Sequence, residues 1–417
     1  MAAALASVFH RGARPLKYVM PQPRPSLGDR HNFGRSVTRH GERVHKPRAL
    51  LWEWLLLHPK SPLRIALARA ASEDELAEGA FDFLPSLRFF QRTPLGGHVE
   101  ALELLPLRTR SAETRRKLAE ITGRAVALFT WLGLSDLHWE NLVLGVDARG
   151  RIVFGPLDVE MILADLSSPT ETKLLPDADP EYAAVCQHAA GVRRVLPYLG
   201  KPVQPADLLA MLGGYRETLG CLTRHARELG RVFADLAELR QTPIRVCLRG
   251  TEEYVRAEPA ALWPPLLPEE LLQLERGDVP YFFRLYGERG IHYFASADLK
   301  RTQRLPLRGD VPQLEPLLRV ERGLGSAQRK RLSVEGLFTL LAAFDHADFS
   351  GRHRGAGLEV GFSARSLSLV LPDGEELRTS RDLSAFVSSV YMPCRCGEVR
   401  SVFVPKVTRC SLAGRGV

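Results

Sequence analysis

The sequence predicts a protein of the α+β class, with two lobes and a smaller α+β region at its C-terminal end. The first observation is that short alternating segments, typical of strands, occur within residues 26–107. The second is that segments of helical period follow, at about 111–132 and 180–240. The third is a change of character after about residue 290. We therefore expect a basic tail at 1–25, a first lobe at about 26–107, a second lobe at about 108–290 and a region of unknown role at 291–417.

Composition is ordinary for a globular protein, with 45% hydrophobic and 25% charged residues among 417. No run of eighteen apolar residues occurs, so we expect no membrane span. The net charge of +9 comes without an aromatic-studded basic stripe, which disfavours nucleic acid as a partner. The six scattered cysteines suit a reducing cytoplasm. Cys394, Cys396 and Cys410 could supply zinc thiolates, but reduced structural thiols are the favoured interpretation because no fourth ligand follows Cys394 closely.

The first lobe begins with two expected strands in residues 35–46, around a turn at His40-Gly41. Lys46 then ends a strand, which is where a phosphate-binding lysine would stand, and Pro47 ends regular pairing. Residues 49–58, rich in Leu and Trp, predict a buried helix, and residues 98–107 predict a further strand.

A long helix is the clearest element of the second lobe. Ser111 can cap its start, and apolar residues recur on one face up to Leu132. The helix leads into Asp136, and a hairpin is expected from 141–144 and 151–154. Further along, 180–240 is expected to be helical with a break at Gly213-Gly214, 333–345 to be a helix, and 358–371 with 377–390 to form a hairpin around 372–374.

The most informative residues are Asp136 and Asn141, followed after the hairpin by Asp158. In kinase-type sites one carboxylate orients the attacking hydroxyl, while an Asn and a later Asp hold Mg²⁺ against the ATP phosphates. Lys46 precedes them from a strand, in the order that a two-lobed kinase presents these groups. A Gly-x-x-x-x-Gly-Lys-Ser/Thr loop is missing, and so are the His-Arg-Asp and Asp-Phe-Gly motifs of protein kinases. His138 stands two residues after Asp136, and this Asp-x-His spacing instead resembles that of lipid kinases.

Four motifs then resemble, in order, the dehydratase domain of class II lanthipeptide synthetases (the LanM type), which has a lipid-kinase-like fold. The resemblance covers about residues 26–285, roughly two-thirds of the chain. A further segment, Gly277-Asp278-Val279-Pro280-Tyr281-Phe282, is also similar to a recurring family signature. The four motifs are Asp29-x-His31 with Lys46-Pro47-Arg48, Asp136-Leu-His138-Trp-Glu140-Asn141, Asp158-Val-Glu160, and Arg245 through Arg249-Gly250-Thr251 to Tyr254.

The resemblance implies that Ser and Thr of a ribosomally made precursor peptide are phosphorylated with ATP and Mg²⁺ and that phosphate is then eliminated. By resemblance, Lys46 binds ATP phosphates, and Asp136 with His138 acts on the substrate hydroxyl. Asn141 and Asp158 would bind Mg²⁺ with support from Glu160. Arg245 and Thr251 match positions that are linked to elimination in the family. Asp29 and His31 match a further pair of site residues.

The segment after 290 lacks the Cys…Cys-His ligand pattern of the zinc-dependent cyclase that follows in this family. We therefore expect no ring formation by this chain and expect a separate cyclase as a partner. Two rival functions stay open. One is a kinase that stops at a phosphorylated peptide or small molecule, and the other is a non-catalytic peptide-binding partner protein.

Four residues also have structural interpretations. His31 could stabilise a loop, and Glu160 could be an ordinary exposed acid. Thr251 could cap a helix that begins near Glu252. Arg249 could pair with a structural carboxylate rather than with phosphate.

Overall fold

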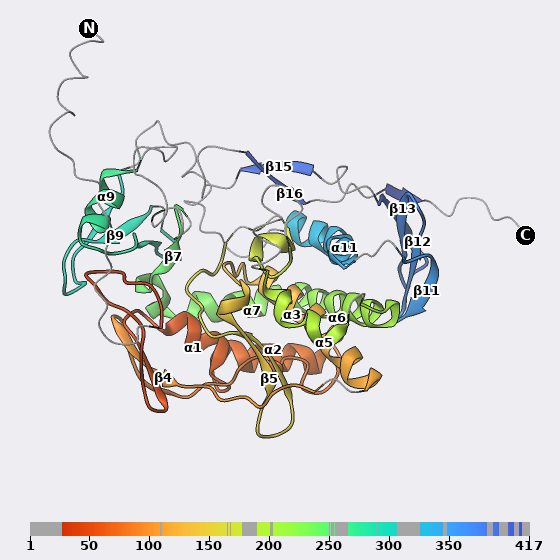
Figure 1. Cartoon of the computed structure of the whole chain (residues 1–417), viewed down its shortest axis with the longest axis horizontal. Helices are drawn as coiled ribbons and strands as arrows, with labels where there is room; N and C mark the ends of the chain where they lie inside the picture. The colour runs from red at the N-terminus through yellow and green to blue at the C-terminus, as the bar shows by residue number, and fades with distance from the viewer. Residues whose placement is uncertain are drawn as a thin grey trace, which may run out of the picture.

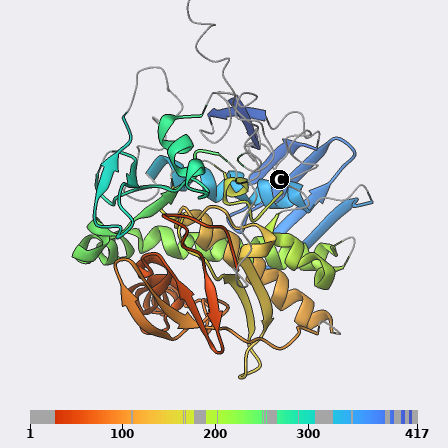
Figure 2. The same ribbon diagram turned by 60° about the vertical axis from the view of Figure 1, so that its left-hand side comes forward.

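The structure, a computed structural model, is a mixed α+β protein whose sheets are antiparallel, as the α+β prediction requires. Its backbone is described for residues 27–108, 111–164, 166, 168–176, 190–200, 203–249, 251, 254, 266–288, 290–306, 326–344, 348–381, 387–391, 399–403 and 408–410, and the side chains of 326–333 and of those last three segments are not described. In Figures 1 and 2 the N-terminal elements lie on one side of the central helices and the C-terminal strands lie on the opposite side. None of the helices in the described portion is long and apolar enough to cross a lipid bilayer.

Helices α3, α6 and α7 lie in the middle of the molecule, and α9 lies at its edge (Figure 1). The bounds of the α-helices are α1 Leu51–Leu57, α2 Pro62–Glu73, α3 Ala112–Trp131, α5 Leu196–Leu199, α6 Pro205–Arg224, α7 Ala226–Asp235, α9 Pro268–Glu275 and α11 Ser326–Ala343. Short 3₁₀ helices are η1 Trp139–Asn141, η2 Pro169–Thr172, η3 Gly191–Arg194 and η4 Ala237–Gln241.

Strands form several small sheets around these helices. The first contains β1 Thr38–His40, β2 Arg43–Lys46, β3 Phe89–Thr93 and β4 Gly96–Glu100 in the order β1-β2-β4-β3. A hairpin is formed by β5 Leu142–Val146 and β6 Ile152–Pro156. The next sheet contains β7 Ile244–Val246, β8 Phe282–Arg284, β9 His292–Phe294 and β10 Thr302–Arg304 in the order β10-β9-β8-β7.

The C-terminal sheet has the order β11-β12-β13-β14-β17, and β15 pairs with β16. These strands are β11 Gly351–Gly355, β12 Leu358–Phe362, β13 Ser366–Val370, β14 Glu376–Ser380, β15 Val387–Tyr391, β16 Val399–Phe403 and β17 Thr408–Cys410. The predicted hairpin turn at 372–374 is confirmed between β13 and β14. The two long strands predicted around it were wrong, because 358–371 folds into two paired strands and 377–390 into parts of two separate sheets.

Several local expectations are confirmed. The turn at His40-Gly41 joins β1 to β2, and β2 ends at Lys46. Ser111 caps α3 by accepting a hydrogen bond from the Thr114 amide at 3.1 Å. The hairpin after Asn141 and the buried helix within 49–58 are also present. The helix predicted at 333–345 exists but begins earlier, at Ser326.

The predicted break at Gly213-Gly214 was wrong, because α6 runs through both residues. The reason is a close crossing of α6 with α3. A Cβ atom on Gly214 would lie 2.4 Å from the carbonyl oxygen of Glu120, and one on Gly123 would lie 1.9 Å from that of Met211. The glycines therefore allow two helix backbones to approach each other, as small residues do at tight helix crossings.

Several elements were not predicted, among them α2 and β3, and one predicted strand is shorter than expected. Helix α2 begins with Pro62 at its first position, and Ser61 caps it by accepting from the Arg64 amide at 3.1 Å. Strand β3 has a bulge against β4. The strand predicted at 98–107 ends at Glu100 in β4, and Leu105 makes an isolated bridge to Val146 in the next hairpin.

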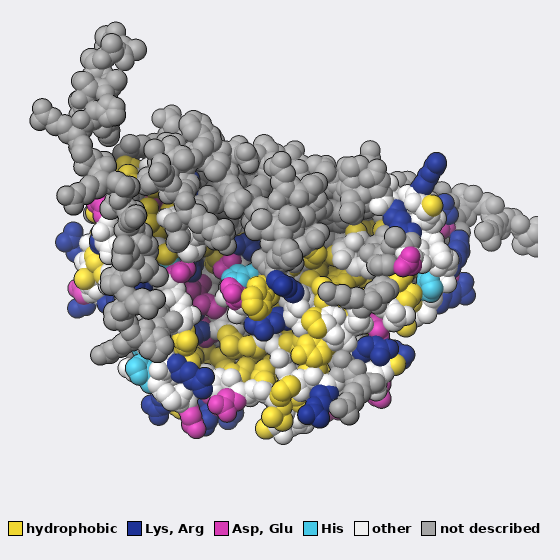
Figure 3. Space-filling model, in the orientation of Figure 1, with side chains coloured by type: hydrophobic (Ala, Val, Ile, Leu, Met, Phe, Trp, Pro, Cys, Tyr) yellow, Lys and Arg dark blue, Asp and Glu magenta, His cyan; other side chains and the backbone are white. Residues whose placement is uncertain are grey.

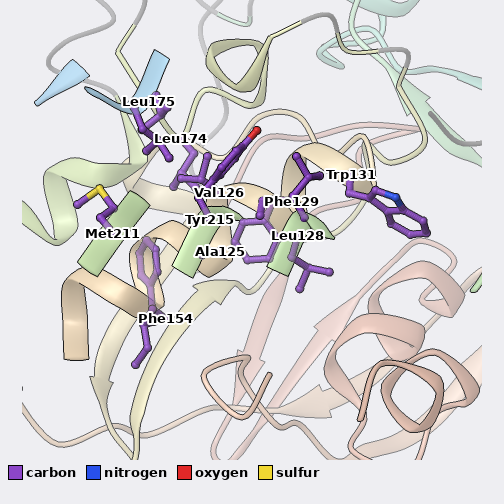
Figure 4. Packing of buried hydrophobic residues seen from close by; sticks show 14 of the residues in the cluster. Ala125, Val126, Leu128, Phe129, Trp131, Phe154, Leu174, Leu175, Met211 and Tyr215 are labelled. Atoms are coloured by element: carbon purple, nitrogen blue, oxygen red, sulfur yellow. The ribbon is translucent and has the colours of Figure 1, made fainter. Parts of the chain in front are cut away.

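Most of these elements share one large hydrophobic core (Figure 4), and a second, smaller cluster lies in the sheet β10-β9-β8-β7 and includes Val246, Phe282 and Tyr293. Phe129 of α3 and Met211 and Tyr215 of α6 are fully buried, and Phe154 of β6 lies among the same cluster. Burial of such side chains is worth about 1.5–3 kcal/mol each. Because α3 is buried along most of its length, its C-terminal end and the loop that follows it are held firmly in place.

We predict that Gly123→Ala lowers the free energy of unfolding by about 1–3 kcal/mol, because its methyl group would overlap the Met211 carbonyl at the helix crossing. Gly230→Ala in α7 is the matched control, since no atom lies within 4 Å of its Cβ position. The control should raise stability by up to about 1 kcal/mol through helix propensity. Urea unfolding of both variants measures the difference, and equal stability would contradict the close crossing.

Candidate functional site

The loop after α3 presents Asp136 in a conformation that few non-glycine residues adopt. Its φ angle is 64°. Hydrogen bonds fix the loop on both sides of it, from the Ser135 amide to the Met161 carbonyl at 3.1 Å and from the Leu137 amide to the Thr172 carbonyl at 2.9 Å. Such backbone strain persists only where the surroundings enforce it, and it is common at functional sites.

Asp136 is bound by two side chains. Asn141 donates from Nδ2 to the Asp136 backbone oxygen at 2.9 Å and to its Oδ2 at 3.2 Å. Lys173 donates from Nζ to Oδ1 at 2.9 Å. Burial acts to raise the pKa of Asp136, but the charges of Lys173 and His138 hold this pKa below its usual value. The carboxylate is therefore ionised at neutral pH and can orient a hydroxyl group.

The hairpin β5–β6 brings Asn141 beside Asp158. The Leu157 amide donates to the Asn141 carbonyl at 3.1 Å, so the two residues lie at the open end of the same strand pair. Asn141 uses its amide nitrogen on Asp136, which leaves its side-chain oxygen as an acceptor. Carboxylate and amide oxygens are the ligands that Mg²⁺ prefers. The side-chain oxygens of Asn141 and Asp158 could therefore contribute to a magnesium site.

A buried charge network links β2, α1 and the end of β6. Glu53 of α1 is completely buried, and it accepts from Lys46 Nζ at 2.8 Å through Oε1. Arg48 donates to its Oε2 at 3.2 Å and also to Asp158 Oδ1 at 2.5 Å. Lys46 further donates to the Leu157 carbonyl at 2.5 Å. The predicted phosphate lysine is therefore held next to the predicted metal-binding aspartate.

Glu160 lies inside this network, so its interpretation as an ordinary exposed acid was wrong. Its Oε1 lies 2.9 Å from Arg48 Nε and 3.7 Å from Arg245 Nη1, and its side chain is 13% exposed. The other oxygen, Oε2, is buried without a hydrogen bond among the described residues. Burial and the neighbouring charge of Asp158 raise the pKa of Glu160.

The pKa of Asp158 is shifted in the opposite direction to that of Glu160. Burial acts to raise the pKa of Asp158, but the charges of Arg48 and Lys46 hold this pKa far below its usual value. Two neighbouring carboxyl groups whose pKa values are pushed apart are typical of acid–base sites. Asp158 stays ionised, and Glu160 is the carboxyl of the pair that takes up a proton first.

Arg245 of β7 joins this network to the N-terminal loop. Its amide donates to the Glu160 carbonyl at 2.9 Å, and its Nη2 lies 3.3 Å from His31 Nε2. His31 places Nδ1 2.8 Å from the Val279 carbonyl, which makes Nδ1 the protonated nitrogen and Nε2 the acceptor. Burial, together with the charge of Arg245, lowers the pKa of His31 to about 3. A neutral His31 therefore holds the guanidinium in place.

The segment around Asp278 explains how a loop far away in sequence reaches Arg245. The fully buried Asp278 carboxylate accepts from the Phe33 and Gly34 amides, each at 2.7 Å. The Val279 amide donates to the Arg30 carbonyl at 2.7 Å. The sequence signature that begins at Gly277 thus anchors the loop that carries His31.

The remaining predicted residues lie further from the charge network. Thr251 donates to Asp29 Oδ2 at 3.2 Å, so its hydroxyl bridges two predicted site residues. Arg249 pairs with Glu270 at 2.9 Å, with both side chains buried, which confirms the structural interpretation of Arg249. The side chain of His138 lies beside η1, with Nδ1 3.9 Å from Glu140. Cys394 and Cys396 lie outside the described residues, and Cys410 is described only in its backbone.

Three site residues were not predicted: Glu53, Arg48 and Lys173. Glu53 had a signal, since a lone acid in the apolar run Leu50-Leu51-Trp52-Glu53-Trp54 must find a buried cation. Arg48 was noted only as part of a motif. Lys173 reaches Asp136 from the C-cap of η2, 37 residues away along the chain, and no sequence pattern indicates this contact.

The space-filling view shows acidic, basic and histidine side chains gathered near the centre of one face, above a group of hydrophobic side chains (Figure 3). Arg245 is the residue through which the parts of the site are connected, because its charge acts on both Asp136 and Asp158. The arrangement can bind anions and a divalent cation and can orient a hydroxyl group.

We predict that the imidazole of His31 stays neutral, protonated on Nδ1, from about pH 5 to pH 8. Its pKa of about 3 lies below the usual 6.5, so below pH 6.5 the unfolded chain binds more protons at this residue. This component of stability is present above pH 6.5 and is lost as pH falls toward 3, and His31→Gln should remove it. Nitrogen-15 NMR measures the protonation, and a His31 signal that titrates near 6.5 would refute the assignment.

Comparison with models of known protein families and with curated proteins finds no match for this chain in either case.

Proposed function

We propose that the chain is a kinase-like peptide dehydratase that uses ATP and Mg²⁺ to phosphorylate Ser and Thr of a ribosomally made precursor peptide and then eliminates the phosphate. The observation that carries this proposal is the position of Arg245. It contacts Glu160 and His31, and its charge acts on both Asp136 and Asp158. The groups suited to phosphoryl transfer and the cation suited to phosphate departure therefore belong to one connected cluster of side chains.

The arrangement of the elements supports a two-lobed, lipid-kinase-like fold for this function. The sheet β1-β2-β4-β3 with α1 corresponds to a first lobe, and α3, α6 and the hairpin β5–β6 correspond to a second. The Lys46–Glu53 pair between a strand and a helix is the type of ion pair that positions the phosphate lysine in kinases. We place the protein in the cytoplasm, where ATP and reduced thiols are available.

Each residue of the transfer step has a physical role. Asp136 orients the substrate hydroxyl or accepts its proton, and His138 assists it. Lys46, which is fixed by its hydrogen bond to the Leu157 carbonyl, binds the ATP phosphates. Asn141 and Asp158 would hold Mg²⁺, which when bound neutralises charge on the phosphates and aligns them for transfer. Arg48 now bonds to Asp158, so metal binding must share or replace that contact.

Elimination needs a cation for the departing phosphate and a base for the α-proton. Arg245 suits the first role because its charge is permanent and its guanidinium is fixed by Glu160 and His31. When Glu160 is protonated, the surrounding Lys46, Arg48 and Arg245 exceed the ionised acids Glu53 and Asp158 by one charge. This excess favours a bound phosphate.

Two rival functions differ from the proposed dehydratase in the chemistry that they require. A kinase that stops at phosphorylation is favoured by the side chain of Thr251, which bonds to Asp29 rather than to the charge network. A non-catalytic peptide-binding protein would require no nucleotide. A separate cyclase remains the expected partner for ring formation.

We predict that intact-mass spectrometry of the precursor peptide, incubated with the protein, ATP and Mg²⁺, shows repeated losses of one water. Asp158→Asn should abolish all change in mass, because the metal ligand is lost. Arg245→Lys should instead accumulate phosphorylated peptide, since a lysine cannot reproduce the bidentate contact with phosphate. Phosphorylated peptide as the final product of the unaltered protein would favour the kinase alternative.

We also predict that Glu53→Gln weakens ATP binding by about tenfold or more, because Lys46 and Arg48 lose their shared buried anion. The same change should lower the free energy of unfolding by about 3–5 kcal/mol. Glu275→Gln, an exposed acid at the end of α9, is the control and should match the unaltered protein. Calorimetric titration with ATP and Mg²⁺ measures the affinity, and unchanged binding in folded Glu53→Gln would reject this role.

A further inference from the structure

A cavity of about 970 Å³ lies apart from the site described above. It is bounded by α2, by the segment 76–86 that follows it, by the end of β4 and by the turn of the hairpin β5–β6. None of the ten predicted site residues lines it. Its size lies at the upper end of the range for ligand sites in proteins, about 300–1,000 Å³.

Arg64 of α2 lines the cavity and is 8% exposed. Its guanidinium donates only to backbone carbonyls, from Nη1 to Leu56 at 3.3 Å and Pro85 at 3.4 Å and from Nη2 to Phe81 at 3.5 Å. Within the described part of the chain no carboxylate forms a salt bridge with it. The charge of Asp82 acts on Arg64 from beyond salt-bridge distance, but Asp82 is paired with Arg151, whose charge opposes this effect. Buried arginines are normally paired with an acid, so this one has room for an anionic partner.

The N–H groups of Arg64 that have no acceptor among the described residues determine which anionic group can bind there. A guanidinium carries five N–H groups, and three of them point to the carbonyls of Leu56, Pro85 and Phe81. The two that remain belong to the neighbouring nitrogens Nε and Nη2. Donors on this pair of nitrogens can match the two oxygens of a carboxylate or of a phosphate. Burial lowers the pKa of Arg64 to about 10, so the group is still charged at neutral pH.

The lining of the cavity is acidic on balance, with six acidic residues and four arginines. Two of these arginines are paired, Arg151 with Asp82 at 3.0 Å and Arg88 with Glu100 at 2.9 Å, and Arg149 is exposed. Glu42 and Glu78 are exposed acids on the lining, and no ion pair to either occurs among the residues that the structure describes. A doubly charged phosphate would be repelled there, whereas a single carboxylate accompanied by a cation would be attracted.

We propose that this cavity binds a peptide segment that presents a carboxylate to the Nε/Nη2 edge of Arg64 and a basic side chain to Glu42 and Glu78. The volume accommodates several residues of an extended chain. The inference does not depend on the proposed dehydratase activity, since it concerns residues outside the Asp136–Asp158 site. If that activity holds, the cavity is a second contact for the substrate peptide, remote from the modified residue.

Calorimetric titration of the full chain with three short capped peptides tests the proposal. The probes are acetyl-Lys-Gly-Glu-amide, the same peptide with Gln in place of Glu, and the same peptide with norleucine in place of Lys. Only the first should bind well, and each neutral replacement should weaken binding at least fivefold. Equal binding of all three, tighter binding of inorganic phosphate, or no binding at all would overturn the assignment.

Two variants and one spectrum locate the binding. Arg64→Lys keeps a buried charge but lacks the forked edge, and it should weaken binding of the first peptide at least tenfold. Arg69→Gln is the matched control on the same helix, because that arginine is exposed and does not line the cavity. In the unaltered protein the Nε–H NMR signal of Arg64 should shift on addition of this peptide. An unshifted signal during measurable binding would place the peptide elsewhere and reject the proposal.

Discussion

The buried carboxylate of Glu53 is the constraint on which the site depends. It lies in an apolar helix with no exposure to water, and an unpaired charge there would cost several kcal/mol. Lys46 and Arg48 supply the compensation, and because Arg48 also bonds to Asp158, the first sheet and the hairpin β5–β6 are fixed relative to each other. One buried acid thus fixes the position of Lys46 relative to Asp158. Loss of any member leaves the others uncompensated.

The same network separates the roles of two neighbouring acids. Asp158 and Glu160 stand two positions apart in the sequence, yet their pKa values move in opposite directions. Both carboxyl groups are buried, which raises the pKa of each. At Asp158 the charges of Arg48 and Lys46 outweigh burial, whereas at Glu160 burial and the charge of Asp158 prevail. An ionised acid suits a metal ion, and an acid that takes up a proton leaves the surrounding cations available to phosphate. Arg245 then links this pair to the loop of Asp136.

Packing, in addition to the charges, holds the loop that carries Asp136 in place. The close crossing of α3 and α6, which Gly123 and Gly214 permit, buries α3 up to the residues that precede Asp136. The strained backbone of Asp136 is maintained by hydrogen bonds from its two neighbours, Ser135 and Leu137. The loop that carries His31 is fixed by hydrogen bonds from the Phe33 and Gly34 amides to Asp278, which precedes β8. The site therefore rests on rigid supports on both sides.

Local signals in the sequence determined much of the frame. The cap at Ser111, the turn at His40-Gly41 and the hairpin after Asn141 follow from short-range preferences of those residues, and all are present. The strand end at Lys46 and the spacing from Asp136 to Asn141 and Asp158 also placed the main candidate residues in the correct elements. Such features need only a few neighbouring residues to form.

The tertiary structure alone decided which side chains meet. Glycines at 213 and 214 look like a helix break, and only the nearby α3 explains why the helix continues through them. The contacts of Lys173 with Asp136, of Arg48 with Asp158 and of His31 with Arg245 join residues separated by 37 to 214 positions. Local preferences carry no information about such distant pairs, because each depends on how whole elements pack. The sequence by itself thus named the candidate groups, and packing decided how they combine.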